Sequence, residues 1–193
     1  ELSHLKKWIT EITNSQLLAI DTETDSLDYM SAKLIGISMS VKPNSAAYIP
    51  LGHDYLGAPE QLDKEIVLNQ LRPILENPHI KKLGQNIKFD MSVFKQHGIN
   101  LCGISFDTML ESYVINSIAT RHDMDSLAST YLNLATTKFT DVAGKGAKKL
   151  TFNQIDLDQA APYASEDADI TLKLHENLWS KIEDEHALKS VFE

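Results

Sequence analysis

The chain has 193 residues, 42% of them hydrophobic and 23% charged, which predicts one globular domain over residues 1–193 and excludes an unfolded chain. Its 27 acidic residues outnumber the 18 basic ones, and the net charge of −9 excludes a protein that attracts nucleic acid over its whole surface. There is no long apolar run and no signal-peptide pattern, and the single Cys102 cannot form an internal disulfide, so we predict a soluble cytoplasmic protein with no membrane partner.

The first half of the chain mixes strand and helix patterns. Leu17 to Ile20 form an apolar run without alternation, which is typical of a strand covered on both faces. A helix over 60–76 is predicted from apolar residues near helical spacing. The other predicted elements of this half are a helix over 3–13, extended segments over 16–22, 33–41, 46–52 and 81–86, and a helix that ends at Gly98.

The second half is predicted to be mainly helical. One helix begins around Asp107, another covers 124–132, and an amphipathic helix covers 158–185. The Gly- and Lys-rich stretch 135–150 is predicted to be a mobile loop. Strands followed by strand–helix alternation indicate an α/β or α+β domain with a mixed central sheet flanked by helices.

Carboxylates recur where such a sheet places ligands. Asp21 and Glu23 end the first strand, and residues two apart on a strand point to the same face. Asp90 lies on the first turn of the helix after strand 81–86. Asp167 lies in the long C-terminal helix, and Tyr163, four residues earlier, shares its face.

Carboxylates that are brought together destabilise a fold unless protons or cations neutralise them. Hard divalent cations take oxygen ligands, and a pair of such ions can promote hydrolysis of a phosphodiester. The net negative charge allows this, because bound cations reverse the local field. The Asp-x-Glu pattern by itself is common, however, and solvated acids at a strand end remain the alternative interpretation.

Three motifs in order make the chain resemble a known family. "DTET" at 21–24, "GQNIKFD" at 84–90 and "YASED" at 163–167 resemble the exonuclease motifs of the DEDD superfamily, Tyr subtype. More narrowly, the whole chain is similar to the 3′→5′ proofreading domain of bacterial DNA polymerase I, a family A polymerase. "FDTMLESYVINS", "RHDMDSLA", "GKGAKKLTFNQI" and "SEDADITL" extend the likeness over essentially the full length.

The resemblance implies a ribonuclease H-like fold and stepwise removal of nucleotides from a single-stranded DNA 3′ end. It implies two divalent ions, Mg²⁺ or Mn²⁺, with Zn²⁺ as an alternative at the tighter site. Asp21, Glu23 and Asp167 would bind the tighter ion, while Asp21 would bridge to the second ion and Asp90 would help to hold it. Tyr163 and Glu23 would orient the attacking water.

The resemblance also suggests how DNA is held. Leu27 would wedge between the last bases and Phe139 would stack on one of them, although both could equally be ordinary core or loop residues. Further strand contacts are implied for Gln85, Asn86 and Arg121. The family places a 5′ nuclease before residue 1 and a polymerase domain in cis after residue 193, and we expect a monomer.

Pro162 departs from an uninterrupted helical pattern immediately before Tyr163. Because proline lacks an N–H and restricts the residue before it, the helix is predicted either to start close to 161 or to kink there. A kink would displace the tyrosine. Two other functions stay open from the sequence. One is an exoribonuclease of the same superfamily, and the other is a catalytically silent scaffold domain of the polymerase.

Overall fold

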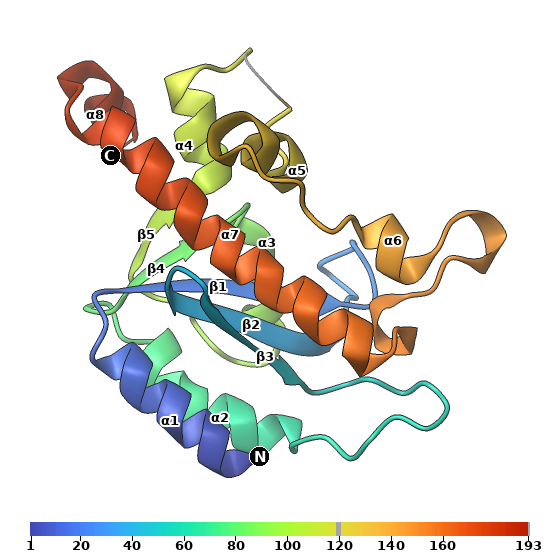
Figure 1. Ribbon diagram of the computed structural model, residues 1–193. Coiled ribbons are helices and arrows are strands. Elements are labelled where there is room, and N and C mark those ends of the chain that lie inside the picture. Colours follow the sequence, from blue (N-terminus) through green and yellow to red (C-terminus); the bar gives the residue numbers. More distant parts are fainter. Residues whose placement is uncertain (119–120, 193) are drawn as a thin grey trace.

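The computed structural model, which describes residues 1–118 and 121–192, contains a mixed five-stranded sheet between layers of helices (Figure 1). The strand order is β3-β2-β1-β4-β5. β1 is antiparallel to β2 and parallel to β4, so the central strand joins the two halves of the sheet. The strands are β1 (Leu17–Thr24), β2 (Leu34–Lys42), β3 (Ser45–Pro50), β4 (Lys81–Gly84) and β5 (Ile104–Asp107). The predicted mixed sheet is confirmed.

The described residues form eight α-helices and three shorter helical turns. The α-helices are α1 (Leu2–Thr13), α2 (Lys64–Leu75), α3 (Lys88–Gln96), α4 (Thr108–Ile115), α5 (Met124–Leu127), α6 (Phe139–Ala143), α7 (Leu157–Glu183) and α8 (His186–Phe192). The shorter turns are a π-helical turn, Ala128–Leu132, and two 3₁₀ turns, Gly146–Lys148 and Phe152–Gln154.

Four of these elements correct the sequence prediction. β5 is not predicted, because its four residues run directly into α4. α2 begins at 64 and not at 60, because the Asp63 carboxylate accepts the Ile66 N–H and caps the helix there. The prediction of an irregular loop over 135–150 is wrong in part, since α6 lies within it. The predicted helix over 158–185 is confirmed by α7, but α8, which follows it, is not predicted.

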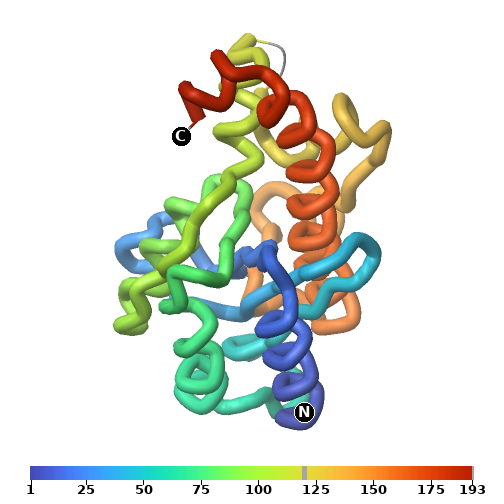
Figure 2. The backbone as a smooth tube through the Cα atoms, turned by 90° about the vertical axis from the view of Figure 1, so that its left-hand side faces the viewer, coloured from blue at the N-terminus to red at the C-terminus, as the bar shows by residue number. Residues whose placement is uncertain are grey.

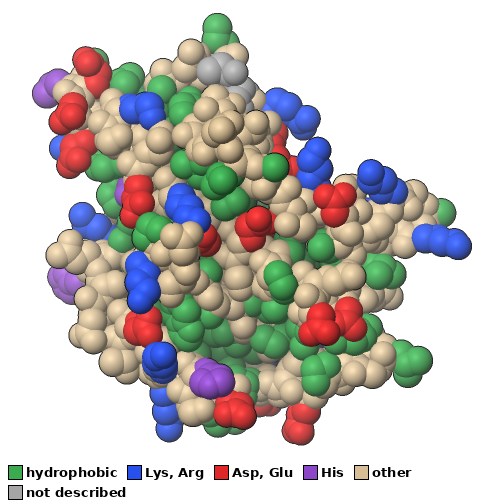
Figure 3. Space-filling view, viewed as in Figure 1, with side chains coloured by type: hydrophobic (Ala, Val, Ile, Leu, Met, Phe, Trp, Pro, Cys, Tyr) green, Lys and Arg blue, Asp and Glu red, His purple; other side chains and the backbone are tan. Residues whose placement is uncertain are grey.

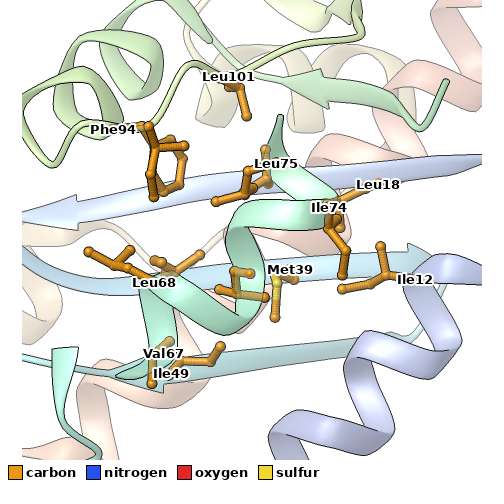
Figure 4. Close-up of a cluster of buried hydrophobic side chains, with 14 of the residues drawn as sticks. Ile12, Leu18, Met39, Ile49, Val67, Leu68, Ile74, Leu75, Phe94 and Leu101 are labelled. Atoms are coloured by element: carbon orange, nitrogen blue, oxygen red, sulfur yellow. The ribbon is translucent and has the colours of Figure 1, made fainter. Parts of the chain in front are cut away.

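Strand alternation divides the sheet into two faces with different cover. Leu18 and Ile20 of β1 pack with Ile37 and Met39 of β2 in the main hydrophobic cluster, which α1 and α2 complete (Figure 4). α7 crosses the other face over β1, β2 and β3 (Figure 1), where Leu172 packs on Ala19. Side chains of β1 therefore point alternately toward α1 and α2 or toward α7.

The long axis of the molecule separates the two ends of the described chain. The N-terminus, at the start of α1, and the C-terminal helix α8 lie at opposite ends of the fold (Figure 2). None of the helices formed by the described residues combines the length and the apolar character that a bilayer crossing requires.

Two features of the surface stand out in Figure 3. Apolar side chains are visible in a hollow of about 640 Å³ that lies between α1, β3 and the loop 51–62. Basic side chains lie on the segment that projects between α6 and α7, where Lys145, Lys148 and Lys149 are exposed. The overall charge of −9 is therefore unevenly distributed.

Candidate metal and active site

Three carboxylates converge on the face of the sheet that α7 covers. Asp21 and Glu23 extend from the end of β1, and Asp167 faces them from α7. One carboxylate oxygen from each residue lies within 4.8 Å of the others. The strand period of two places the first pair on one face, and the packing of α7 across β1 brings the third group to them. Three of the four acids that the sequence analysis singles out therefore lie together.

Burial and mutual repulsion both favour the protonated forms of these acids. Desolvation raises the pKa of Asp21 to about 7, although the Thr22 N–H partly offsets this. Desolvation, followed by the charges of Asp21, Asp167 and Asp90, raises the pKa of Glu23 well above its usual range. The pKa of Asp167 is likewise raised well above its usual range, first by desolvation and then by Asp21. Without a cation, this cluster therefore retains protons that separate carboxylates would release.

Asp90 approaches the same strand end from the opposite face. It lies in the first turn of α3 and its side chain is only 2% exposed. Its Oδ1 accepts two hydrogen bonds from Thr22, from the backbone N–H at 2.8 Å and from the hydroxyl at 2.5 Å. Desolvation and then the charge of Asp21 raise its pKa. Asp90 is therefore electrostatically coupled to the cluster, but it lies outside the group of three whose oxygens are within 4.8 Å.

The donor set fits divalent cations. All four groups offer carboxylate oxygens, which Mg²⁺ and Mn²⁺ prefer over nitrogen or sulfur. Glu23 is 9% exposed, and its Oε1 is buried with no hydrogen-bond partner among the described residues. A buried charged oxygen without a donor is costly unless a cation or a proton occupies it. The unpartnered oxygen and the raised pKa values thus both indicate that a cation would bind at Glu23 and the carboxylates beside it.

Tyr163 lies one helical turn before Asp167, with its hydroxyl interacting with that carboxylate. Burial, followed by the charges of Asp167 and Glu23, raises the pKa of Tyr163 above its ordinary value. The hydroxyl therefore keeps its hydrogen at neutral pH. It can orient a neighbouring group by hydrogen bonding, but it is not a base.

Pro162 does not begin the helix. α7 starts at Leu157, where Asp156 caps it, and the exposed Pro162 lies in the helix interior. The prediction of a helix start close to 161 is therefore wrong. Tyr163 remains on the face of α7 that carries Asp167, and its ring packs against Phe139 and Phe152 with centroids 6.1 and 6.0 Å away.

The residues that the resemblance assigns to DNA contacts lie in different settings. Leu27 is 92% exposed in the loop that follows β1, and Phe139 is half-buried at the start of α6. Phe139 stacks on Phe152 with a centroid distance of 6.3 Å, and the Lys149 ammonium lies 4.8 Å above its ring. An aromatic face with a cation nearby is suited to a nucleobase beside a phosphate.

Gln85 and Asn86 lie between β4 and α3, and Arg121 lies shortly before α5. The Gln85 side-chain amide donates to the His122 carbonyl at 2.8 Å and accepts from the Thr108 hydroxyl. Asn86 is exposed at a positive φ of 58°. The Arg121 side chain is 88% exposed and its Nε lies 3.3 Å from an Asp123 oxygen. Asn86 and Arg121 are therefore accessible, whereas the Gln85 amide is used within the protein.

Three residues around the site have roles that the sequence motifs do not reveal. Thr22 supports Asp90, while Tyr48 and His53 form a hydrogen-bonded pair beside the β2 residue opposite Glu23. Thr22 lies within the "DTET" motif, but only the fold shows which carboxylate it reaches. No spacing in the sequence identifies Tyr48 or His53, because the register of β1, β2 and β3 brings them to the site.

Comparisons with known proteins agree with this geometry. A family model described as "3'-5' exonuclease" matches residues 1–183. DNA polymerase I of Pseudomonas aeruginosa is 53% identical over 91% of this chain, and the match covers 20% of that protein. The chain spans about a fifth of the length of the curated relatives it matches.

Solved structures agree on the fold. The POL domain of Pol1 from M. smegmatis is 18% identical, with a TM-score of 0.70 over 96% of this chain and 27% of that chain. The catalytic core of RRP6 from Trypanosoma brucei is 13% identical, with a TM-score of 0.73 over 100% of this chain and 48% of that chain. The predicted ribonuclease H-like α/β fold is confirmed.

Proposed function

The chain belongs to the 3′–5′ exonuclease family, and from this premise we propose that it removes nucleoside monophosphates one at a time from the 3′ end of single-stranded or frayed DNA. The relatives that match it across most of its length are DNA polymerases I, in which it corresponds to one part of a longer protein. The proposed role is therefore proofreading, with a polymerase domain in the same polypeptide and in the bacterial cytoplasm.

One observation carries the proposal. Oxygens of Asp21, Glu23 and Asp167 lie within 4.8 Å of one another, and Glu23 Oε1 is buried without a protein donor. A binding or scaffold domain has no need to keep such an arrangement, because burying like charges together destabilises the fold. A hydrolase that holds divalent ions against a phosphodiester needs it.

Asp21, Glu23, Asp167 and Asp90 would hold two divalent ions, Mg²⁺ or Mn²⁺. Such ions supply positive charge that lowers the pKa of water and stabilises the negative charge of a leaving oxygen. Asp21 is suited to be a ligand of both ions, because its charge raises the pKa of Glu23, Asp90 and Asp167 alike.

The chain's own groups then orient the reactants. Tyr163 keeps its hydrogen and, with Glu23, positions a water in line with the scissile P–O3′ bond. The water oxygen gives up a proton to solvent and forms the new bond to phosphorus as the bond to the 3′ oxygen breaks, and that 3′ oxygen takes up a proton from solvent. The products are a nucleoside 5′-monophosphate and a DNA strand with a free 3′ hydroxyl. None of the four acids is a nucleophile in this scheme.

The 3′-terminal bases would be held by apolar and aromatic contacts. The exposed Leu27 would separate the last bases, and the Phe139 ring would stack on one of them in place of the Lys149 ammonium that now lies over it. Stacking of this kind contributes about 1–3 kcal/mol per base and tolerates any sequence. Asn86 and Arg121 are the accessible groups proposed to contact the strand.

The experiment is release of label from a 3′-labelled single strand in the presence of Mg²⁺ or Mn²⁺. We expect mononucleotides from the unaltered chain and none above background from the Asp21→Ala/Glu23→Ala variant. Matched DNA and RNA oligomers separate the proposed activity from that of an exoribonuclease, because an RNA enzyme would degrade the RNA faster. A scaffold domain would release nothing and would bind no cation through the carboxylates in a calorimetric titration.

A further inference from the structure

The β-ladder places Tyr48 on the same face of the sheet as the carboxylate cluster. Ser38 pairs with Asp21 on one side and with Tyr48 on the other, so all three side chains point toward α7. The neighbouring pair is Glu23 opposite Gly36. Tyr48 therefore lies two strands away from Asp21, in a row across the sheet that includes this proposed metal ligand.

Gly36 lets the Tyr48 side chain reach toward Glu23. A Cβ atom built on Gly36 would overlap both the Tyr48 hydroxyl and its ring. In a directly opposed antiparallel pair, Cβ positions are roughly 4.5–5.5 Å apart. The Tyr48 hydroxyl therefore fills the space that a side chain on Gly36 would take, next to Glu23 on the neighbouring strand. The negative charge of Glu23 contributes to the raised pKa of Tyr48, after desolvation, in agreement with this proximity.

His53 holds the Tyr48 hydroxyl from the other side. The hydroxyl oxygen lies 2.7 Å from His53 Nε2, and His53 Nδ1 lies 3.1 Å from the Ile155 carbonyl oxygen. Gln61 also fixes the backbone of His53, accepting its N–H at 2.9 Å and donating to its carbonyl at 2.7 Å. The ring is therefore oriented by both its nitrogens and its backbone.

The hydrogen-bond partners decide which nitrogen of His53 carries hydrogen. A carbonyl can only accept, so Nδ1 must donate to Ile155. In neutral imidazole Nε2 is then an acceptor, and the Tyr48 hydroxyl must donate to it. His53 is 5% exposed, and burial lowers its pKa, which favours the neutral ring. The single hydrogen of Tyr48 thus points away from Glu23.

The hydrogen bond to His53 holds the Tyr48 hydroxyl in a position from which it makes no hydrogen bond to Glu23. Glu23 Oε1 has no partner among the described residues, although the Tyr48 ring lies over Gly36, the residue opposite Glu23. The other acceptor near Tyr48 is the Ile35 carbonyl, which is 3.5 Å away and already accepts the Leu51 N–H at 2.8 Å. Without His53, the Glu23 carboxylate would be the better acceptor for the tyrosine hydrogen.

We propose that His53 is a positioning residue for the metal site: by accepting the Tyr48 hydrogen, it keeps Glu23 Oε1 free to bind a divalent cation. The inference rests on the proposed function, because it assigns Glu23 to a cation. His53 itself touches neither the cation nor the substrate. The same pair also packs against Phe152, with centroid distances of 6.2 Å from Tyr48 and 5.6 Å from His53.

The test is a calorimetric titration of the 193-residue chain with Mn²⁺. In His53→Leu, the Tyr48 hydroxyl loses its acceptor and turns to Glu23, so the cation must displace a charged hydrogen bond. We expect the Kd for Mn²⁺ to rise on the order of tenfold. Tyr48→Phe removes the competing hydrogen and should bind Mn²⁺ as tightly as the unaltered chain. The double variant Tyr48→Phe/His53→Leu should recover most of the lost affinity.

Recovery of affinity in the double variant distinguishes this role from a general packing role. If His53→Leu weakened binding only by disturbing the packing, removing the Tyr48 hydroxyl as well would not restore the affinity. The inference is overturned if the double variant binds as weakly as His53→Leu, or if Tyr48→Phe alone weakens binding tenfold. Circular dichroism checks that each variant folds. If His53→Leu does not fold, Tyr48→Phe and His53→Gln are compared instead. His53→Gln keeps an acceptor for the Tyr48 hydrogen and should bind Mn²⁺ normally. If the unaltered chain binds no Mn²⁺ through Asp21 and Glu23, the proposed function fails instead.

Discussion

Thr22 donates both its backbone N–H and its hydroxyl to a single oxygen of Asp90, a residue 68 positions away in the chain. The two acids that flank Thr22 point toward α7, whereas Thr22 points toward the face that carries α3. The strand therefore contributes two of the proposed cation ligands on one face and holds a third, Asp90, on the other. This alternation explains how a core strand can bring repelling carboxylates together at a defined geometry.

Replacing Thr22 tests whether Asp90 must be held in this way. Thr22→Val keeps the shape of the side chain but removes the hydroxyl, so the buried Asp90 oxygen loses one of two donors. We expect the domain to lose about 1.5–3 kcal/mol of unfolding free energy and activity to fall about 10- to 100-fold. Thr22→Ser should retain most of both, as measured by urea unfolding and by nucleotide release. Equal activity of the Val and Ser variants would show that the backbone N–H alone suffices.

Removing one acid should affect activity and metal-free stability in opposite directions. In Asp167→Asn, a cation ligand is lost and the rate of nucleotide release should fall on the order of 10³-fold or more. The same change relieves repulsion on Glu23 and Asp21, so the melting temperature in EDTA should rise or stay constant. Asp158→Asn, at an exposed position in the first turn of α7, is the matched control and should leave the rate unchanged. A large fall in metal-free stability of Asp167→Asn would contradict the account.

The four acids and Tyr163 were predicted from the resemblance of three short motifs to a known family, and the structure brings Asp21, Glu23 and Asp167 together. Asp21 and Glu23 follow one apolar run, and Tyr163 and Asp167 are one helical turn apart. The pairing of Thr22 with Asp90, and of Tyr48 with His53, could not be predicted, because each depends on strand register or on contacts between distant segments. β5 and α6 were missed for a related reason. Each is four or five residues long, too short for a hydrophobic period to be read.

The stability of the metal-free chain should fall as pH rises. The pKa of Asp21 is about 7 in the folded chain, against 3.8 for an unperturbed aspartate, and Glu23, Asp90 and Asp167 shift in the same direction. Between about pH 4 and pH 7, the native state holds protons that the unfolded state has released. The stabilisation by these protons is fully present below pH 4 and is lost through pH 7 and above.

Thermal melts in EDTA from pH 5 to pH 8 measure this dependence. We expect the melting temperature to fall across the range, by roughly 2–4 °C for each kcal/mol lost in a domain of this size. Asp21→Asn should show a shallower fall, and the two curves should converge toward low pH. Mg²⁺ added at pH 8 should raise the melting temperature of the unaltered chain by mass action. Parallel curves for the variant and the unaltered chain would mean that Asp21 does not retain its proton.

Pro162 should cost stability without supporting the chemistry. It lies exposed in the interior of α7, where it cannot donate the hydrogen bond that the carbonyl of residue 158 would otherwise accept. Pro162→Ala should raise the unfolding free energy by about 1–3 kcal/mol and leave nucleotide release within twofold. Gln159→Ala, an exposed change in the same helix, should have little effect on either. A loss of activity in Pro162→Ala would indicate that the proline sets the position of Tyr163.

Tyr163→Phe should lower turnover without weakening the cation site. The hydroxyl interacts with Asp167, and its raised pKa keeps it protonated, so it can orient a water but contributes no metal charge. We expect the rate of nucleotide release to fall about 10- to 100-fold, less than for loss of an acid, with an unchanged Kd for Mn²⁺. The ring would still pack on Phe139 and Phe152, so the melting temperature should change little. Tyr131→Phe removes a hydroxyl from a different cluster and is the control for general effects. A loss as large as that of Asp167→Asn, or a weaker Mn²⁺ titration, would show that the hydroxyl helps to hold the carboxylates and does not merely orient water.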